Sequence, residues 1–193
     1  MNYDRMLSRA VALPSRIPPE KDIPSILGYC GTLAEDTFGA HTTLLPWRVV
    51  VRREPEYPET IAYSTHIDIA LCEGRSWVGY FYEASHESVH ALDATEATRG
   101  EATRLEEGVA YAFSLYVVGL VFGPAQVRNL ADGGDYEKAR SRISKIDSDV
   151  LRLGRKVRAR AGSFRKVSAN DILAIYPDTP ESLLSELLRK FEY

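Results

Sequence analysis

Two histidines that lie four positions apart are the best candidates in this sequence for binding a metal ion. They flank a glutamate in the stretch His86-Glu87-Ser88-Val89-His90. Residues four apart on a helix share one face, so both imidazoles can reach one ion. Glu87 is rotated from them by about 100°. We therefore expect it beside the ion, where its carboxylate can take a proton from a metal-bound water.

A third ligand is expected from the acidic pair that opens the next predicted helix, Glu106 and Glu107. Catalytic zinc is commonly bound by two histidines and a glutamate, with water in the fourth position. Adjacent helical residues point about 100° apart, so only one of the pair can face the ion. We favour Glu107, because Gly108 beside it would let the histidine helix approach closely; Glu106 would support a ligand or face solvent. Glu107→Gln should then weaken zinc binding at least about tenfold, and Glu106→Gln only a few-fold.

These two segments together resemble the gluzincins, a group of zinc metallopeptidases in which His-Glu-x-x-His is followed by a glutamate on the next helix. The segment 107–111, Glu-Gly-Val-Ala-Tyr, is similar to the one that carries the third ligand in the aminopeptidase branch. Residues 60–118 also resemble the small bacterial zincins of the ImmA/IrrE type and the minigluzincins. Glu83 departs from the pattern, because many members of the group have an apolar or β-branched residue there.

The resemblance implies a small α+β zincin-like core with a short sheet, two metal-site helices and a C-terminal helical extension. It implies that His86, His90 and Glu107 bind Zn²⁺ and that Glu87 is the catalytic base. The protein would then be a zinc-dependent metallopeptidase that hydrolyses a peptide or protein substrate with metal-activated water. A second function stays open, a zincin-like binding or regulatory module with negligible turnover, because the sequence identifies no residue that stabilises an oxyanion.

The composition is that of an ordinary globular domain. With 193 residues, of which 45% are hydrophobic, the chain is long enough for a sizeable core. We therefore expect one domain over residues 1–193, in which 1–20 form an N-terminal arm and 134–193 a C-terminal helical part. The net charge of −3 predicts no general attraction to nucleic acid or to an anionic membrane surface.

Two further features predict a cytoplasmic protein that does not cross a membrane. The sequence has no run approaching the length of about 18 apolar residues that a membrane span needs, and its start has no signal-peptide core. Cys30 and Cys72 have no C-x-x-C spacing, so we expect both to be reduced and buried. The oligomeric state is left open.

Hydrophobic periodicity and turn residues predict mostly helices around a short sheet. We expect strands at 47–53 and 60–71, turns or loops at 54–58, 123–124 and 132–135, and helices at 24–38, 76–95, 101–120, 136–160, 168–176 and 179–191. By the family resemblance, the strand at 60–71 would form the edge along which an extended peptide substrate lies.

Other polar residues have alternatives that the sequence leaves open. Tyr111, one helical turn after the expected third ligand, either stabilises an oxyanion or is a core aromatic residue. Asp93 either orients an imidazole or lies at the surface. His41 and His66 are expected to be hydrogen-bonded structural residues. The basic residues within 152–166 favour a solvated helix face over a nucleic-acid contact, because no aromatic platform accompanies them.

Overall fold

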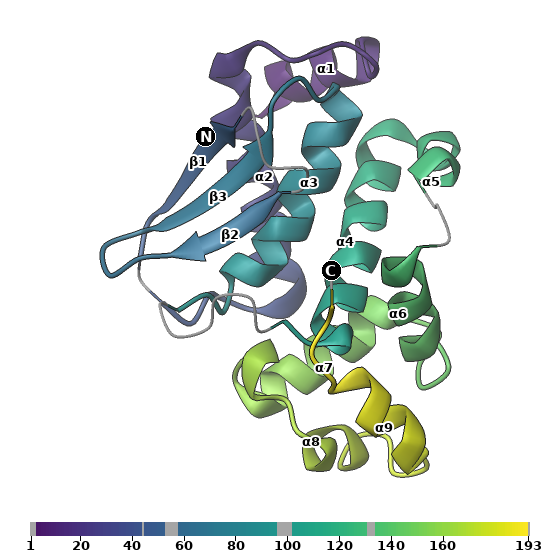
Figure 1. Cartoon of the computed structure of the whole chain (residues 1–193). Coiled ribbons are helices and arrows are strands. Elements are labelled where there is room, and N and C mark those ends of the chain that lie inside the picture. The colour runs from purple at the N-terminus through teal and green to yellow at the C-terminus, as the bar shows by residue number, and fades with distance from the viewer. Residues whose placement is uncertain (1–2, 44, 53–57, 96–101, 131–133, 193) are drawn as a thin grey trace.

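The computed structural model of the chain describes residues 3–43, 45–52, 58–95, 102–130 and 134–192. Its elements are α1 (Asp4–Ala12), η1 (Glu20–Asp22), α2 (Ile23–Phe38), β1 (Trp47–Arg52), β2 (Glu59–Ala62), β3 (Ile67–Cys72), α3 (Trp77–Ala91), α4 (Arg104–Phe122), α5 (Pro124–Leu130), α6 (Asp135–Ile143), α7 (Val150–Ala161), η3 (Phe164–Lys166), α8 (Ala169–Leu173) and α9 (Glu181–Leu187). The fold is α+β and mostly helical, as expected. Figure 1 shows the sheet on one side of α3, with α4 and the later helices on the other.

The sheet is built from three strands in the order β1-β3-β2. β1 runs parallel to β3, and β2 runs antiparallel to it. The single strand expected at 60–71 is wrong, because the chain turns back after Ala62, where the Tyr63 N–H donates to the His66 carbonyl over 2.8 Å. β3 thereby becomes the central strand, buried along its whole length, and β2 becomes an edge.

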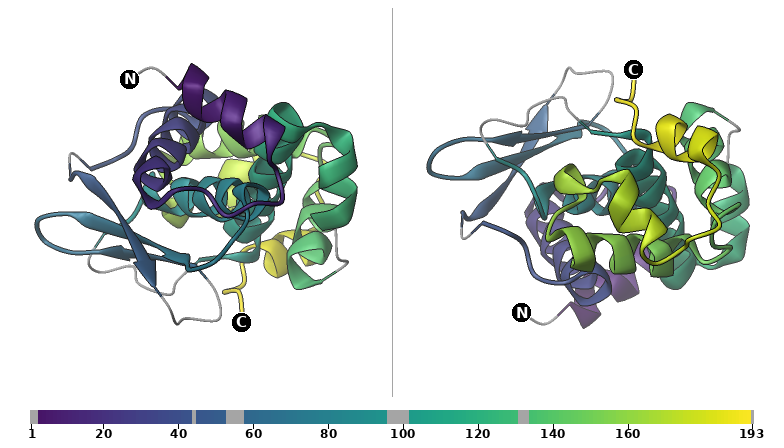
Figure 2. Two further views of the ribbon diagram at one scale, coloured as in Figure 1. Left: turned by 90° about the horizontal axis from the view of Figure 1, so that it is seen from above. Right: turned by 90° about the horizontal axis from the view of Figure 1, so that it is seen from below.

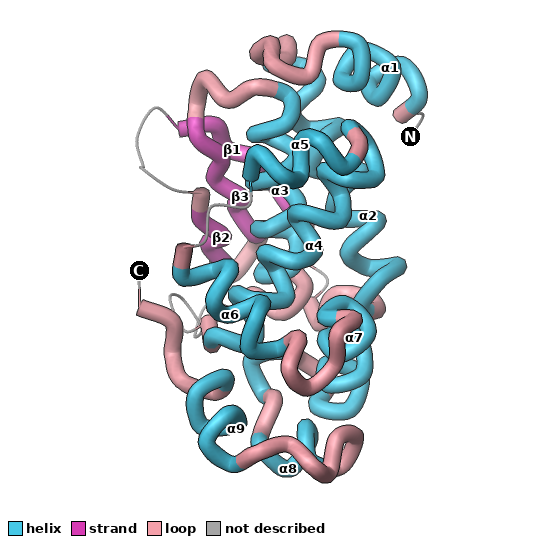
Figure 3. The backbone as a smooth tube through the Cα atoms, turned by 90° about the vertical axis from the view of Figure 1, so that its right-hand side faces the viewer, coloured by secondary structure: helices cyan, strands magenta, loops and turns pink. Residues whose placement is uncertain are grey.

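The predicted histidine helix, α3, lies at the centre of the molecule. Ser76 caps its start as predicted, with its hydroxyl accepting from the Gly79 N–H over 3.2 Å. The helix is buried along almost all of its length, because it packs against β3, α2 and α4. Figure 3 shows the strands on one side of α3 and helices on the other sides.

The predicted second helix, α4, packs against α3 and α6. Thr103 caps its start by accepting from the Glu106 N–H over 3.2 Å. By length and composition alone α4 could cross a membrane, but 61% of its apolar window is buried inside the protein. Such burial is typical of the core helix of a soluble protein.

The long helix expected at 136–160 is wrong, because α6 and α7 are separated by a turn. Asp149 caps α7 by accepting from the Arg152 N–H over 2.9 Å, and Asp147 accepts from the Asp149 N–H over 3.0 Å. Hydrogen bonding to the Arg152 guanidinium holds the pKa of Asp147 well below its usual range. Aspartate favours helix caps over helix interiors because its side chain competes for backbone N–H groups.

The remaining C-terminal elements differ from the prediction mainly in length. Pro124, expected in a turn, opens the short helix α5. Ser168 caps α8 as predicted, but the final helix ends at Leu187 and residues 188–192 lie outside it. Seen from below, α7 and α8 cover one end of the molecule (Figure 2, right).

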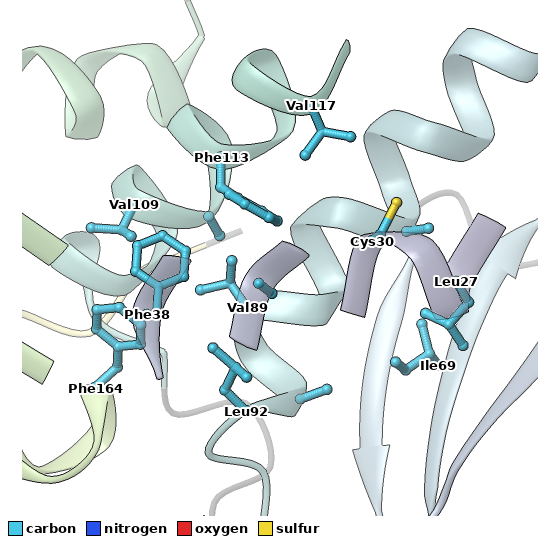
Figure 4. Close-up of a cluster of buried hydrophobic side chains, with 14 of the residues drawn as sticks. Leu27, Cys30, Phe38, Ile69, Val89, Leu92, Val109, Phe113, Val117 and Phe164 are labelled. Carbon is cyan, nitrogen blue, oxygen red and sulfur yellow. The ribbon is translucent and has the colours of Figure 1, made fainter. Parts of the chain in front are cut away.

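One hydrophobic cluster joins residues from α1 to α9. Phe38 at the end of α2 packs edge-on against Phe113 of α4 and Phe164 of η3, with ring centroids 5.4 and 5.6 Å apart (Figure 4). Cys30 lies in the same cluster, and both it and Cys72 are buried and form no disulfide, as predicted. The C-terminal helices therefore share a core with the helices that carry the candidate site.

Candidate metal centre

The last turns of α3 and the first turn of α4 bring the candidate ligands together. On α3, His86, Glu87 and His90 are 6%, 4% and 6% exposed. Glu106 and Glu107 open α4 and are fully buried. Carboxylates are favoured there, because the start of a helix carries a partial positive charge.

His86, His90 and Glu107 form a buried group that can hold a metal ion. The two Nε2 atoms lie 3.2 Å apart. Glu107 places one carboxylate oxygen 3.1 Å from His86 Nε2 and the other 3.4 Å from His90 Nε2. A tetrahedral ion with bonds of 2.0–2.1 Å separates its ligand atoms by about 3.3 Å. The nitrogen–nitrogen spacing and each oxygen–nitrogen spacing are close to this value, although the two Glu107 spacings are made by different oxygens of its carboxylate.

The electrostatics of this group favour a cation between its members. Burial alone would raise the pKa of Glu107, but the His90 charge and hydrogen bonds to both imidazoles hold that pKa well below its usual range. Burial alone would lower the pKa of His90, yet Glu107 and Glu106 raise it well above its usual range. A metal ion would have to displace the proton that His90 holds, so metal binding should strengthen as the pH rises.

Glu106 supports His90 from outside the ligand group. Its carboxylate lies 2.7 Å from His90 Nδ1. Because a carboxylate only accepts, Nδ1 carries the proton, and in the neutral imidazole Nε2 presents its lone pair toward His86 and Glu107. Arg165 of η3 lies 3.3 Å from the same Glu106 oxygen. Sequence reasoning missed Arg165, which comes from the segment expected to be a solvated basic face.

Glu87 is held by a residue of the edge strand. The hydroxyl of Thr60 on β2 lies 2.7 Å from Glu87 Oε2 and 3.1 Å from the Glu87 carbonyl oxygen. Burial raises the pKa of the Glu87 carboxyl, although His90, His86 and the Thr60 hydroxyl counteract part of that effect. A carboxylate with a raised pKa is a better proton acceptor near neutral pH. No sequence signal marked Thr60, which is 27 residues from its partner.

From the sequence we expected Gly108 to let α3 approach α4 closely. In the structure it is α6 that approaches α4 at Gly108. A Cβ atom at this position would lie 2.6 Å from Ile143 Cδ1 and 2.9 Å from the backbone of Ala139. The close approach of α6 positions Tyr136, whose ring lies edge-on to His86 with centroids 5.4 Å apart. The reason given from sequence for preferring Glu107 is therefore wrong, although Glu107 does lie in the ligand group.

Four other polar residues singled out in the sequence have contacts outside the ligand group. Asp93 accepts from Arg158 over 2.9 and 3.1 Å, so it links the segment that follows α3 to α7, and these contacts are not with an imidazole. Glu83 accepts from the backbone N–H of Cys72 over 2.9 Å, which explains an acid inside this helix. His41 contacts Glu35, and His66 contacts Thr65.

The remaining alternatives concern Tyr111 and the basic segment. Tyr111 is buried, and its ring stacks on Tyr136 with centroids 6.2 Å apart. Because Tyr136 contacts His86, Tyr111 belongs to a group of aromatic residues next to the ligand group. Within the basic segment, Arg152 pairs with Asp147 and Arg160 with Asp171, so two of its charges are balanced by carboxylates of the same chain.

Comparisons of the chain with protein-family models, with curated proteins and with solved structures found no match. Membership of the gluzincins therefore stays a prediction that rests on the two motif segments. A functional assignment must come from the geometry of the site itself.

Proposed function

We propose that the protein is a zinc-dependent metallopeptidase that hydrolyses a peptide bond with metal-activated water. The observation that carries this proposal is the meeting of His86, His90 and Glu107 in one buried group that can hold a metal ion, next to a buried Glu87. Two imidazoles and a carboxylate are a donor set that suits Zn²⁺, and three protein ligands leave a fourth position for water, as catalytic sites require.

The chain's own residues have distinct roles in the proposed reaction. Zn²⁺ held by His86, His90 and Glu107 would lower the pKa of a bound water to about 7 and would polarise the scissile carbonyl. Glu87 accepts a proton from the water and passes it to the leaving amine. Thr60 holds one oxygen of Glu87 and leaves the other for the proton. Glu106 keeps His90 in the tautomer and orientation that binds metal.

The edge strand β2 offers a place for the substrate backbone. In the described sheet, β2 pairs with β3 on one side, so its other side is an edge. An extended peptide can pair with such an edge through backbone hydrogen bonds. Because Thr60 on this strand contacts Glu87, a peptide bound along β2 would lie close to the proposed base.

Digestion of a peptide library by the zinc-loaded protein tests the proposal. We expect cleavage that a chelator abolishes and added zinc restores, and that falls at least about hundredfold in Glu87→Gln, the low end for loss of a general base. Glu181→Gln, on the exposed surface of α9, is the matched control and should cleave normally. Full activity in Glu87→Gln with zinc still bound would rule out the mechanism.

One observation favours the second candidate, a metal-binding regulatory module. His86, Glu87 and His90 are almost completely buried, which restricts access by a peptide. The same library experiment separates the two functions. One equivalent of tightly bound zinc with no cleavage of any peptide supports the module, whereas zinc-dependent cleavage excludes it.

A further inference from the structure

The segment that follows α9, here called the C-terminal tail (residues 188–192), runs back to the start of α4. Lys190 forms an antiparallel bridge with Thr103. On either side of it, the Arg104 N–H donates to the Arg189 carbonyl over 3.0 Å and the Phe191 N–H to the Ala102 carbonyl over 2.9 Å. Figure 1 shows the tail in front of the first turns of α4. The tail thus pairs with residues 102–104 in the way that an added peptide strand would.

The tail carries an aromatic side chain toward the candidate metal centre. Phe191 is 6% exposed, and its ring stacks on Tyr136 with centroids 5.0 Å apart. Tyr136 in turn lies edge-on to His86, with centroids 5.4 Å apart. One aromatic ring therefore separates the tail from a proposed metal ligand.

The end of the tail forms part of the wall of a cavity of about 260 Å³ that also contains three cationic side chains, here called the basic cavity. It is lined by Arg104, Asp135, Lys138, Arg142, Phe191 and Glu192. Both of its arginines lie near Glu186 of α9, at 3.5 and 2.7 Å, and its lysine pairs with Asp135 at 2.7 Å. Glu192 lines the same cavity as these three cations.

We propose that residues 102–104, Tyr136 and the basic cavity form a peptide-binding site, and that the tail occupies the part of this site formed by residues 102–104 and Tyr136 within its own molecule. The ligand is an extended peptide segment in which an aromatic residue is followed by an acidic one. Backbone pairing with 102–104 supplies affinity, and the aromatic stack and the cations supply specificity. A tethered tail competes strongly, because its effective concentration is in the millimolar range for a short linker.

The consequence for catalysis rests on the proposed function. If the protein is a peptidase, peptides of this class are its substrates, and the tail keeps them from the metal centre until it is displaced. The pairing with residues 102–104 and the stack of Phe191 on Tyr136 are made by groups outside the proposed ligand set, although Tyr136 also lies edge-on to His86, so we expect the site to bind peptide without metal.

Peptide binding by the full-length chain tests the proposal directly. The probe is a fluorescein-labelled, amidated peptide LRKFE, which is the sequence of residues 188–192, and the measurement is fluorescence anisotropy. The double variant Phe191→Ala/Glu192→Ala frees the site, so it should bind the probe at least tenfold more tightly than the wild type. Glu181→Gln, an exposed change on α9 outside the tail and the cavity, should behave as the wild type.

Two controls keep the result interpretable. A probe with alanine in place of its phenylalanine and glutamate should bind neither protein. Adding Lys138→Glu, a change at a side chain that is 59% exposed, should weaken probe binding by the freed variant at least fivefold. Equal binding by wild type and freed variant, or no effect of Lys138→Glu, would overturn the proposal if thermal melting shows the variants folded. An unfolded double variant would be replaced by Glu192→Lys alone, which must also tighten binding relative to wild type.

The outcome is separable from that of the proposed function, because anisotropy is measured on metal-free and zinc-loaded protein alike. If the protein binds the probe but cleaves no peptide, the proposed peptide-binding site is supported and the proposed peptidase activity is contradicted. Cleavage that the freed variant performs no faster than the wild type would refute the inhibitory role of the tail.

Discussion

Replacing Glu106 by glutamine should weaken zinc binding by about tenfold to hundredfold, the usual cost of losing a partner that supports a metal ligand. The structure raises this value above the few-fold change expected from sequence, because Glu106 is fully buried and lies 2.7 Å from His90 Nδ1. Glutamine keeps the shape and an acceptor oxygen but removes the negative charge that strengthens electron donation by His90. The corresponding loss of binding free energy is about 1.4–2.8 kcal/mol.

Competition with a chromophoric zinc chelator measures this effect. Glu107→Gln should bind zinc more weakly still, because it alters a proposed ligand rather than its support. Glu181→Gln, exposed on α9, should match the wild type. Unchanged affinity in Glu106→Gln, or a larger loss in Glu106→Gln than in Glu107→Gln, would mean that the roles of these two glutamates are misassigned.

Three further substitutions test other contacts. Thr60→Val should lower kcat about tenfold to hundredfold and leave the zinc affinity unchanged, because a hydrogen bond to a charged group such as Glu87 contributes about 1.5–3 kcal/mol. An unchanged kcat would mean that Thr60 does not position Glu87 for the reaction. Arg158→Met should lower the free energy of unfolding, measured by urea titration, by about 3–5 kcal/mol, because it leaves Asp93 as a buried uncompensated charge. A loss below about 1 kcal/mol would show that the ion pair of Arg158 with Asp93 does not stabilise the fold. Asp147→Asn should melt at a lower temperature than wild type at neutral pH. The lowered pKa of Asp147 contributes stability that is fully present above the pKa of about 3.9 in the unfolded chain and is lost at lower pH. If the difference in melting temperature between wild type and Asp147→Asn stays the same in acid, the stabilisation does not come from the charge of Asp147.

The helices of the site could be predicted from sequence because their signals are local. The two histidines are separated by one helical turn, and Ser76 gives a start signal directly before the apolar positions. The same helical geometry predicted that only one of Glu106 and Glu107 faces the ion, but the reason for choosing Glu107, a close approach of α3 at Gly108, was wrong. Contacts within one or two turns of a helix depend on spacing that the sequence contains.

The errors arose where distant packing decides the local structure. The chain reverses between Ala62 and Ile67 without glycine, proline, asparagine or aspartate, so its alternation appears to continue as one strand. The apolar stripe of 136–160 also continues across the turn between α6 and α7, and only Asp147 and Asp149 mark the break.

The supporting residues of the site could not be predicted for the same reason. Thr60 reaches Glu87 from the edge of the sheet, and Arg165 reaches Glu106 from a turn near the C-terminus. Both contacts depend on how separate elements pack, which neither periodicity nor motif spacing records. The C-terminal tail is a third example, because it was expected to continue a helix.

Anomalous X-ray scattering at the zinc edge, measured on crystals of the zinc-loaded protein, tests the central claim most directly. We predict one strong peak about 2.0–2.2 Å from His86 Nε2, His90 Nε2 and a Glu107 oxygen, with Glu87 close by but not bound. The absence of a peak between these three side chains, or a peak bound by Glu106 in place of Glu107, would contradict the proposed metal centre.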